Sequence, residues 1–416
     1  MIECCQTIER PPAANSSQSL RILRVIASTD PRDGGPIEGF LQSARTLQEM
    51  GHHCTAVTLD SPNDPWVIDF PYPVIATGHT KWPRWILPIL RRYRYSRHLG
   101  LWLREHARDY DVIIVSGLWN YCAFACRKVL PRAGVPYFVF THGMLDPWFR
   151  RAYPLKHLVK QLSWLVSEGP LLRHARGVIF TSEEERRSAR GAFWPYRINE
   201  FVVGYGTNDP TGDAAAQSRA FRSTLPELAD RPFMLFLSRI HPKKGCDILI
   251  EAFAKLATHD PELQLVMAGP DQIGMKANLA TRAAQLGIAD RVHWTGMLKG
   301  DEKWGAFHAC EAFVLPSHSE NFGIVVAEAL ACGKPVLITN KINIWREIEQ
   351  DGAGLVANDT EEGITKLLKD FSKLRPERRE QIGKAARQLF LNRFDLRKNQ
   401  SRLLELILDT QQPTIK

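Results

Sequence analysis

The sequence contains no apolar run long enough to cross a membrane. A membrane-spanning helix needs about 20 predominantly apolar residues, whereas apolar segments of this chain such as WILPIL at 85–90 are short and interrupted by proline. The first residues also lack the apolar core of a secretory signal peptide, because they combine acidic and polar side chains. We therefore expect a cytoplasmic protein with a disordered lead-in over residues 1–19.

Sequence signals for a bound metal ion are also missing. No Cys-x-x-Cys and no nearby pair of histidines completes a ligand set around the eight cysteines, so buried thiols explain them better. One Asp-x-Asp triplet, Asp109–Tyr110–Asp111, directly precedes the apolar run VIIVS. We interpret this triplet as the turn that enters a strand, and we expect no metal-binding residues.

The dinucleotide fingerprint Gly-x-Gly-x-x-Gly does not follow the first apolar run. Gly34, Gly35 and Pro36 stand there instead, before a helical pattern. Glycines at a strand-to-helix turn let backbone amides approach an anion closely. A plain turn explains the same residues equally well.

The formal charge of +9 is concentrated in the first half of the chain. Residues 1–205 hold 26 basic and 18 acidic side chains, whereas the remainder holds 28 and 27. Residues 81–104 mix Arg with Trp, Leu and Ile, a composition typical of helices that lie on anionic bilayers. This composition predicts peripheral contact of the segment with the inner membrane face. The alternative is an ordinary helix packed on a sheet with a solvated arginine face. We expect no nucleic-acid partner, since no recognised module accompanies the charge.

Short β-branched runs alternate with helical patterns along both halves of the chain. This alternation predicts an α/β protein with two doubly wound, Rossmann-like parallel sheets covered by helices. A stretch rich in Gly, Pro and Asp at 200–213 separates the halves, so we place the domains at 20–205 and 206–390. Ligands of such sheets bind in the cleft beyond the carboxyl ends of the strands. The expected strands are 20–28, 54–59, 111–117, 135–143, 177–182, 233–239, 263–269, 291–296, 312–317, 334–339 and 354–358.

Two polar motifs directly follow expected strands. In THGMLDPW, His142 ends the run 135–143, where an imidazole could bond a sugar hydroxyl, orient a leaving group or be structural. Arg239 and Lys244 flank a proline-containing turn, and two cations at a helix start suit a diphosphate. A solvated basic turn is the alternative, and the neighbouring Lys243 competes with Lys244 for the role.

A third motif, LPSHSENFGIVVAEALACGKPV at 315–336, carries two carboxylates eight residues apart. Gly323 would let amides at the start of the next helix face a phosphate. Glu328 lies about two turns into that helix among apolar neighbours, where a carboxylate needs a partner. It could accept both hydroxyls of a ribose, while Glu320 accepts hydroxyls of a transferred sugar. The alternative makes Glu320 a helix cap and Glu328 a surface acid.

Together, the Arg-x4-Lys pair and the Glu-x7-Glu element resemble those of family 4 glycosyltransferases of the two-domain GT-B fold. The resemblance covers most of the chain and is strongest from Phe233 to Thr339, while THGMLDPW is similar to bacterial members that build exopolysaccharide or other surface glycans. It implies a retaining hexosyltransferase that uses a UDP-, GDP- or ADP-sugar and a glycan or lipid-linked acceptor, with no metal or cofactor. It also implies that residues 391–416 form a helix that crosses back to the first domain.

Carried over by position, the resemblance implies a role for each motif residue. Arg239 and Lys244 would hold the donor diphosphate, and Glu328 the ribose. Glu320 and His142 would bind the transferred sugar. The other donor contacts that it implies are Gly34, Gly35, Asn321, Phe322, Gly323, Ile324, Gly269 and Met297.

The chain departs from the family pattern at the interdomain turn. It has VGYGTND at 203–209, where many relatives have Pro-Asn-Gly-Val-Asp, so donor contacts made from that turn are not implied here. No acidic residue stands out as the nucleophile that a double-displacement mechanism requires. The resemblance favours same-face attack, with a donor phosphate oxygen assisting deprotonation of the acceptor.

Other functions are compatible with the same fold. A sugar-nucleotide epimerase would turn over donor without an acceptor, and a phosphorylase would need a pyridoxal-binding lysine in a much longer chain. A non-catalytic nucleotide-sugar-binding scaffold is the alternative from another class. The presence of all four charged motif residues argues against a scaffold, since a scaffold need not keep them.

Overall fold

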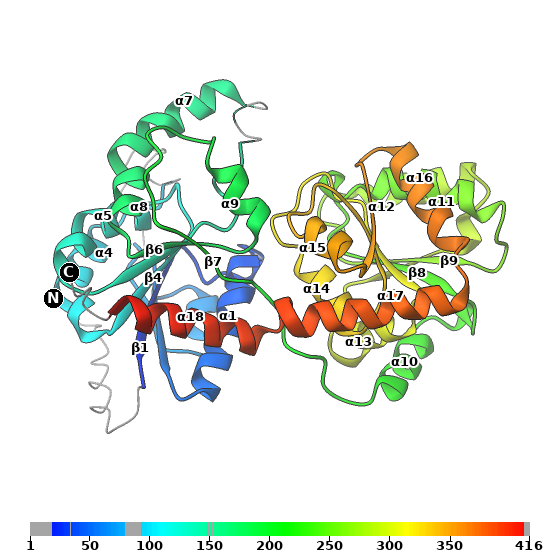
Figure 1. The fold of residues 1–416 in the computed structure, drawn as a ribbon, viewed down its shortest axis with the longest axis horizontal. Helices are drawn as coiled ribbons and strands as arrows, with labels where there is room; N and C mark the ends of the chain where they lie inside the picture. Colours follow the sequence, from blue (N-terminus) through cyan, green and yellow to red (C-terminus); the bar gives the residue numbers. More distant parts are fainter. Residues whose placement is uncertain (1–18, 34, 80–92, 148–149, 151–152, 412–416) are drawn as a thin grey trace.

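The computed structural model describes residues 19–33, 35–79, 93–147, 150 and 153–411, which form two α/β domains side by side (Figure 1). The first domain has a seven-stranded sheet in the order β3-β2-β1-β4-β5-β6-β7, and the second has a six-stranded sheet in the order β10-β9-β8-β11-β12-β13. All neighbouring strands are parallel. Both orders are doubly wound, which confirms the predicted fold class.

All eleven strands expected from the sequence are present. The two that were missed, β3 and β7, are three residues long and lie at the two edges of the first sheet, where a strand has one neighbour and a weaker pattern. The strand bounds are β1 Arg21–Ile26, β2 His53–Thr58, β3 Val74–Ala76, β4 Val112–Ser116, β5 Tyr137–Phe140, β6 Gly177–Phe180, β7 Glu200–Val202, β8 Phe233–Leu237, β9 Gln264–Ala268, β10 Val292–Gly296, β11 Ala312–Leu315, β12 Val336–Thr339 and β13 Gly354–Ala357.

Helices cover both faces of each sheet (Figure 1). In the first domain, one apolar core joins the sheet to α1 and α18 and a second joins it to α4, α5 and α8, while a single large core fills the second domain. The helix bounds are α1 Gly35–Glu49, α2 Pro65–Ile68, α4 Arg97–His106, α5 Tyr121–Ala133, α7 Pro154–Ser163, α8 Gly169–His174, α9 Glu183–Ala189, α10 Ala214–Ser223, α11 Cys246–Ala257, α12 Met275–Gln285, α13 Gly300–Ala309, α14 Ile324–Ala331, α15 Trp345–Gln350, α16 Glu361–Ser372, α17 Pro376–Leu389 and α18 Leu396–Gln411.

The last two helices run along both domains, as the red ribbon of Figure 1 shows. Helix α17 packs on the second domain, and a π-helical turn at Phe390–Phe394 leads into α18. Helix α18 contacts α1 and buries Leu403, Leu404 and Ile407 in the core of the first domain. Burial of these side chains anchors the end of the chain to the domain that also contains its beginning.

The basic segment expected at 81–104 is described only in part, because residues 80–92 lie outside the described residues. Helix α4 buries Leu99 and Leu103 in the core and exposes Arg97 and Arg104 to solvent. The described part therefore follows the alternative interpretation, a helix packed on the sheet with a solvated arginine face. None of the described helices combines the length and apolar character that a membrane-spanning helix requires.

Candidate functional site

The structure brings the two charged motifs of the second domain into direct contact. Strands β8 and β11 are neighbours in the sheet, so the loops at their carboxyl ends meet. The Lys244 ammonium forms an ion pair with the Glu320 carboxylate, and the two side chains are only 13% and 23% exposed. The cation predicted for the diphosphate and the acid predicted for the sugar therefore neutralise each other.

Backbone contacts fix the position of the Lys244 turn. Residues Pro242–Lys244 form one 3-10 turn, which ends at Gly245 in a left-handed conformation with φ of 66°. A β-carbon on Gly245 would lie 2.2 Å from the Pro316 carbonyl oxygen, so only glycine allows this approach. Such an anchor selects Lys244, rather than the exposed Lys243, as the lysine that faces Glu320.

Arg239 adds a further positive charge at the same edge. Its side chain is exposed, and His241 lies beside it. Partial burial lowers the pKa of His241, and the positive charges of Arg239, Lys243 and Lys244 lower it further. The turn after β8 is therefore strongly electropositive, as a diphosphate site requires.

The loop that carries Glu320 is pinned on the loop after β12. The Glu320 amide donates to the Lys341 carbonyl (3.0 Å), and the Asn343 amide donates to the Glu320 carbonyl (3.1 Å). Gly323 then turns the chain into α14 with φ of 73°. Helix α14 begins at Ile324, so the amides of its first turn follow Glu320 closely in the sequence.

Glu328 is 3% exposed and faces α13. Its Oε1 is 2.6 Å from the Lys303 ammonium, whereas Oε2 is buried without a partner among the described residues. Burial raises the pKa of Glu328, the charge of Glu38 raises it further, and Lys303 opposes both. One prediction needs correction, since Glu328 stands little more than one turn into α14. Lys303 supplies part of the partner that a buried carboxylate needs, and the ribose contact stays a prediction.

His142 lies just beyond β5, with a left-handed φ of 48°. Its ring stacks on Phe140 (5.7 Å between centroids) and meets Tyr205 edge-on (6.4 Å). Its Nε2 is buried without a partner among the described residues. Burial, with the nearby positive charge of Arg24, lowers the pKa of His142 to about 4, so the ring is neutral near pH 7 and offers a hydrogen bond rather than a charge.

This lowered pKa predicts a stability change with pH. A histidine in the unfolded chain binds a proton near pH 6.5, but His142 in the folded chain does so only near pH 4, so acid favours unfolding between these values. On lowering the pH from 8 to 5, the wild type should lose up to about 2 kcal/mol more unfolding free energy than His142→Gln. Urea unfolding of both proteins at each pH measures the difference, and parallel pH curves would contradict it.

Asn321 joins the two domains across the cleft. Its side-chain Nδ2 donates to Thr181 Oγ1 (3.2 Å) in the first domain, and its Oδ1 accepts from Asn343 Nδ2 (3.2 Å) in the second. A β-carbon on Gly143 would lie 2.7 Å from the Asn321 side chain, so the domains approach closely there. The Asn321 side chain thus bridges the domains, and the donor contact predicted for this residue stays a prediction.

Glu185 on α9 was not identified from the sequence. Its Oε1 accepts from Thr141 Oγ1 (2.7 Å) and the Gly143 amide (2.5 Å), and its Oε2 accepts from the Thr181 amide and hydroxyl (both 2.7 Å). This buried carboxylate therefore holds the loop around His142 together with the residue that meets Asn321. Its sequence signals are a place in the run TSEEE and the capping-box spacing from Ser182, and neither indicates burial of the carboxylate.

Tyr205 was also missed, although it lies in the stretch where the sequence departs from the family pattern. Its ring contacts Phe322 (5.3 Å) and His142 (6.4 Å). Its hydroxyl fills the space where a β-carbon on Gly39 of α1 would stand. Tyr205 therefore links the interdomain turn to both sides of the site.

The remaining predicted residues lie along the same carboxyl edges. Gly269 follows β9 with φ of 138°, and a β-carbon there would clash with the Ser238 carbonyl (1.8 Å). Met297 follows β10 and is 58% exposed. Gly35 begins α1, and Gly34 lies outside the described residues. The donor contacts of these residues stay predictions.

The Asp-x-Asp triplet lies at the opposite end of the first sheet. Asp111 accepts hydrogen bonds from the backbone and the guanidinium of Arg21, which begins β1. The carboxylate therefore joins two strand entries, as expected for a turn. Among the described residues, no three potential metal-ligating side chains of His, Cys, Asp or Glu cluster together.

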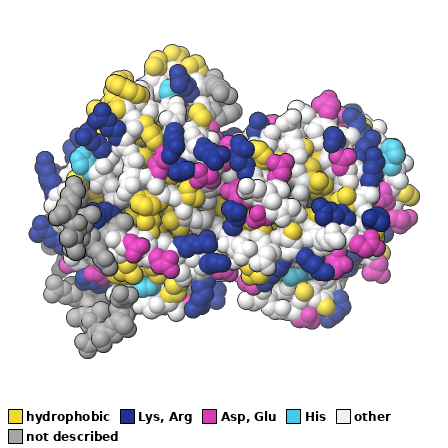
Figure 2. Space-filling view, in the orientation of Figure 1, with side chains coloured by type: hydrophobic (Ala, Val, Ile, Leu, Met, Phe, Trp, Pro, Cys, Tyr) yellow, Lys and Arg dark blue, Asp and Glu magenta, His cyan; other side chains and the backbone are white. Residues whose placement is uncertain are grey.

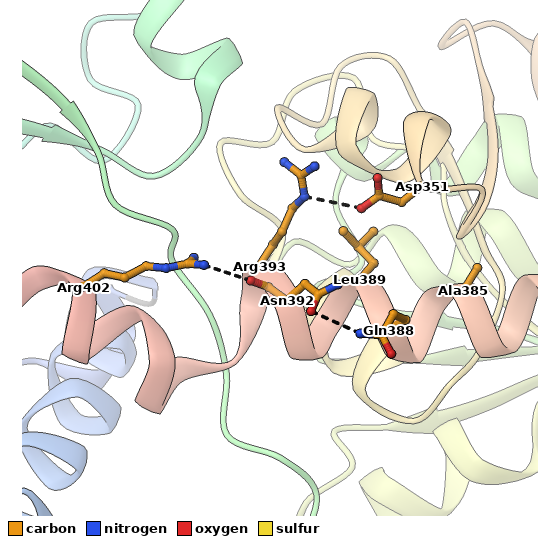
Figure 3. A pocket seen from close by; sticks show the side chains of 7 residues that line it. All are labelled: Asp351, Ala385, Gln388, Leu389, Asn392, Arg393 and Arg402. Atoms are coloured by element: carbon orange, nitrogen blue, oxygen red, sulfur yellow. Dashed lines mark hydrogen bonds and ion pairs between the residues drawn. The ribbon is translucent and has the colours of Figure 1, made fainter.

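A hollow of about 670 Å³ lies at the linker between α17 and α18 (Figure 3). Its polar groups bond one another: Arg393 pairs with Asp351 (3.4 Å), and Arg402 donates to the Asn392 carbonyl (3.2 Å). Nearby, the Thr207 amide donates to the Phe394 carbonyl (3.1 Å). The hollow lies near the two chain segments, around Thr207 and around Phe394, that link the domains. It contains none of the motif residues.

Two family models match the chain, one over each domain. Residues 34–206 match the model described as a glycosyl transferase 4-like domain, and residues 217–389 match the model described as glycosyl transferases group 1. Two curated relatives are named D-inositol 3-phosphate glycosyltransferase. The one from Saccharomonospora viridis is 32% identical over 196 residues, which is 45% of each chain. The one from Frankia alni is 40% identical over 241 residues, 56% of this chain and 58% of the relative.

The aligned regions thus span about half the length of these curated relatives. A solved structure of Anabaena HepE in complex with UDP superposes with a TM-score of 0.74 and 19% identity, covering 94% of this chain and all of HepE. At this level of identity the similarity shows a common fold.

Proposed function

Because the chain belongs to the family 4 glycosyltransferases of the GT-B fold, we propose that it moves a hexose from a nucleoside-diphosphate sugar to a glycan or lipid-linked acceptor. The observation that carries the proposal is the buried Oε2 of Glu328, which has no hydrogen-bond partner among the described residues and lies in the helix that follows the Glu320 loop. A buried carboxylate oxygen without a hydrogen bond is costly, and a ribose hydroxyl would satisfy it.

The donor is expected to bind across the edge of the second sheet. Glu328 would accept from the ribose, and Arg239 and Lys244 would hold the diphosphate. Glu320, released from its ion pair with Lys244 by the incoming phosphates, would accept from hydroxyls of the hexose, with His142 facing them from the first domain. HepE has been solved with UDP and with UDP-glucose, so we propose a uridine nucleotide first, ahead of GDP or ADP.

We propose transfer with retention by same-face attack. The bond between the sugar C1 and the diphosphate breaks as the acceptor oxygen bonds to C1 on the same face, and the acceptor proton passes to an oxygen of the departing phosphate. Arg239 and Lys244 stabilise the negative charge that develops on the leaving group. These two cations would supply the charge that a divalent metal provides elsewhere, so we propose activity without one.

For the biological role, we propose surface-polysaccharide synthesis with peripheral association at the inner membrane face. The motif THGMLDPW, whose loop is anchored by Glu185, supports a role in surface-polysaccharide synthesis. A lipid-linked acceptor would require association with the membrane, because its lipid stays in the bilayer.

Nucleotide-dependent thermal stabilisation in EDTA tests the donor site. One of UDP, GDP or ADP, present at about 100 times its Kd, should stabilise the wild type by about 2.7 kcal/mol. Glu328→Gln should lose most of this gain, because the amide cannot accept at both positions. The matched control is Glu302→Gln, on the exposed side of the facing helix α13, which should respond as the wild type does.

The outcomes separate the candidate functions. Nucleotide release that depends on an added acceptor supports the transferase. Conversion of the donor sugar without acceptor would assign an epimerase, and binding without any turnover would assign a scaffold. No stabilisation by any of the three nucleotides would contradict the donor site.

A further inference from the structure

Helix α7 of the first domain leaves one whole face uncovered. Of the fourteen exposed large hydrophobic side chains among the described residues, six lie on α7 and the π-helical turn Trp164–Glu168 that extends it: Leu155, Leu158, Val159, Leu162, Leu165 and Val166. Leu155 is 79% exposed and Val159 69%. Figure 2 shows hydrophobic side chains gathered over the upper end of the first domain, where Figure 1 places α7. We call these six residues the α7 face.

None of the residues of α7 itself is fully buried, but its other side and the π-helical turn contact the rest of the domain. The Trp164 ring stacks on Phe193 (5.1 Å), and its Nε1 donates to the Pro195 carbonyl (2.9 Å). His157 stacks on Phe193 as well (4.9 Å). This packing fixes which side of the helix points outward, and the exposed side is the apolar one. A contiguous apolar surface of this kind marks an interaction site.

The exposed charges of this segment have one sign. From Arg150 to Glu168 the sequence contains two arginines, two lysines and a histidine, and its one acidic residue, Glu168, is buried. Arg150 and Lys156 are exposed at the margin of the face, and Trp194, 77% exposed, lies beside Gln161 of the same helix. Helices that lie on anionic bilayers combine an apolar face with basic residues at its margins and a tryptophan near the lipid headgroups. The α7 face and its surroundings have the same combination.

The position of α7 relates this face to the cleft. Lys160 lies 4.7 Å above the Trp119 ring, just beyond the carboxyl end of β4, and Trp119 Nε1 donates to the Met144 carbonyl (3.0 Å) in the loop that follows β5. Helix α7 is therefore attached to the loops at the cleft end of the first sheet, on the domain that would receive the acceptor.

We propose that the α7 face docks the protein on anionic phospholipid, with the helix lying in the plane of the bilayer surface. A second copy of the chain fits less well, because pairing through this face would bring the basic margins of two helices together. The proposal rests on the proposed function in one respect only: docking would bring the cleft to a lipid-linked acceptor. Binding to lipid itself requires no donor chemistry.

Vesicle co-sedimentation of the full-length protein tests the proposal. The wild type should bind vesicles that contain phosphatidylglycerol, bind phosphatidylcholine vesicles more weakly, and lose affinity as ionic strength rises. The double variant Leu158→Glu/Leu162→Glu should bind at least about tenfold more weakly, because two carboxylates oppose burial of the face. Ile273→Glu, at an exposed apolar position of the second domain, is the matched control and should bind normally.

Both variants should keep the thermal stability and the nucleotide response of the wild type, since the substituted side chains project into solvent. Failure of the wild type to bind anionic vesicles, or equal binding by the double variant, would overturn the proposal. If the wild type were a dimer and the double variant a monomer, the α7 face would be assigned to contact with a second copy. This result would also overturn the proposal. Vesicle binding without a nucleotide response would support the docking surface and contradict the proposed transferase. A nucleotide response without vesicle binding would support the transferase and contradict the docking surface.

Discussion

Lys244→Ala should lower turnover by about 10²–10³-fold, the usual cost of removing one preorganised charge donor from a transition state. Lys244 is held by the 3-10 turn after β8 and pairs with Glu320 at the edge where the diphosphate is expected. Because the charge on the diphosphate grows as the C1–O bond breaks, the loss should appear in kcat more than in donor affinity.

The neighbouring lysine provides the control. Lys243 is exposed, and the structure pairs Lys244, not Lys243, with Glu320. Lys243→Ala should therefore lower turnover much less than Lys244→Ala does, because solvent screens an exposed charge. Initial rates with saturating donor compare the two variants. Wild-type turnover in Lys244→Ala, or equal losses in both, would remove the assigned role of Lys244.

Glu185→Gln should destabilise the first domain by about 2 kcal/mol or more and also lower turnover. The carboxylate accepts four hydrogen bonds with its two oxygens, and two of the donors are backbone amides that no rotation can redirect. Replacing one oxygen with an NH₂ group places two donors against each other, which leaves a buried amide unsatisfied. The loops around Gly143 and Thr181 would then lose their common anchor.

Two measurements distinguish positioning from simple stability. Denaturant unfolding reports the loss of free energy, and turnover well below the unfolding transition reports the position of His142 and of the Thr181 contact to Asn321. Glu183→Gln is the matched control, since Glu183 lies in the same glutamate run but forms a surface ion pair with Arg186. If Glu185→Gln lost stability with full turnover, the residue would be structural only.

Both substitutions act at the meeting of the two domains, which the structure shows in contact. Asn321 bonds Thr181 on one side of the cleft, and Arg346 pairs with Glu184 (2.7 Å) nearby. Two chain segments link the domains, and they bond each other where the Leu396 amide donates to the Thr207 carbonyl (3.1 Å). Two short linking segments permit hinge motion between the domains. We therefore expect donor entry to begin with release of the hydrogen bond between Asn321 and Thr181.

The sequence alone determined the fold class and predicted where the site lies. Parallel strands are buried on both faces and give continuous β-branched runs, and a polar residue directly after such a run must lie at the carboxyl edge of the sheet. For this reason Lys244 and Glu320, in the loops that follow two such runs, could be placed at one edge before any contact was known. The motif spacing could not distinguish Lys244 from Lys243, because that choice depends on the anchored turn at Gly245.

Only the tertiary structure decided which charges are paired and which apolar faces are covered. Lys303 meets Glu328, and Glu185 meets Thr141, across 25 and 44 residues of chain, through contacts that no local pattern encodes. The α7 segment has the period of an ordinary amphipathic helix, which predicts an apolar face but not what lies against it. Packing of the opposite side against Phe193 and Pro195 leaves that face outside, since a helix can bury only the side that its neighbours reach.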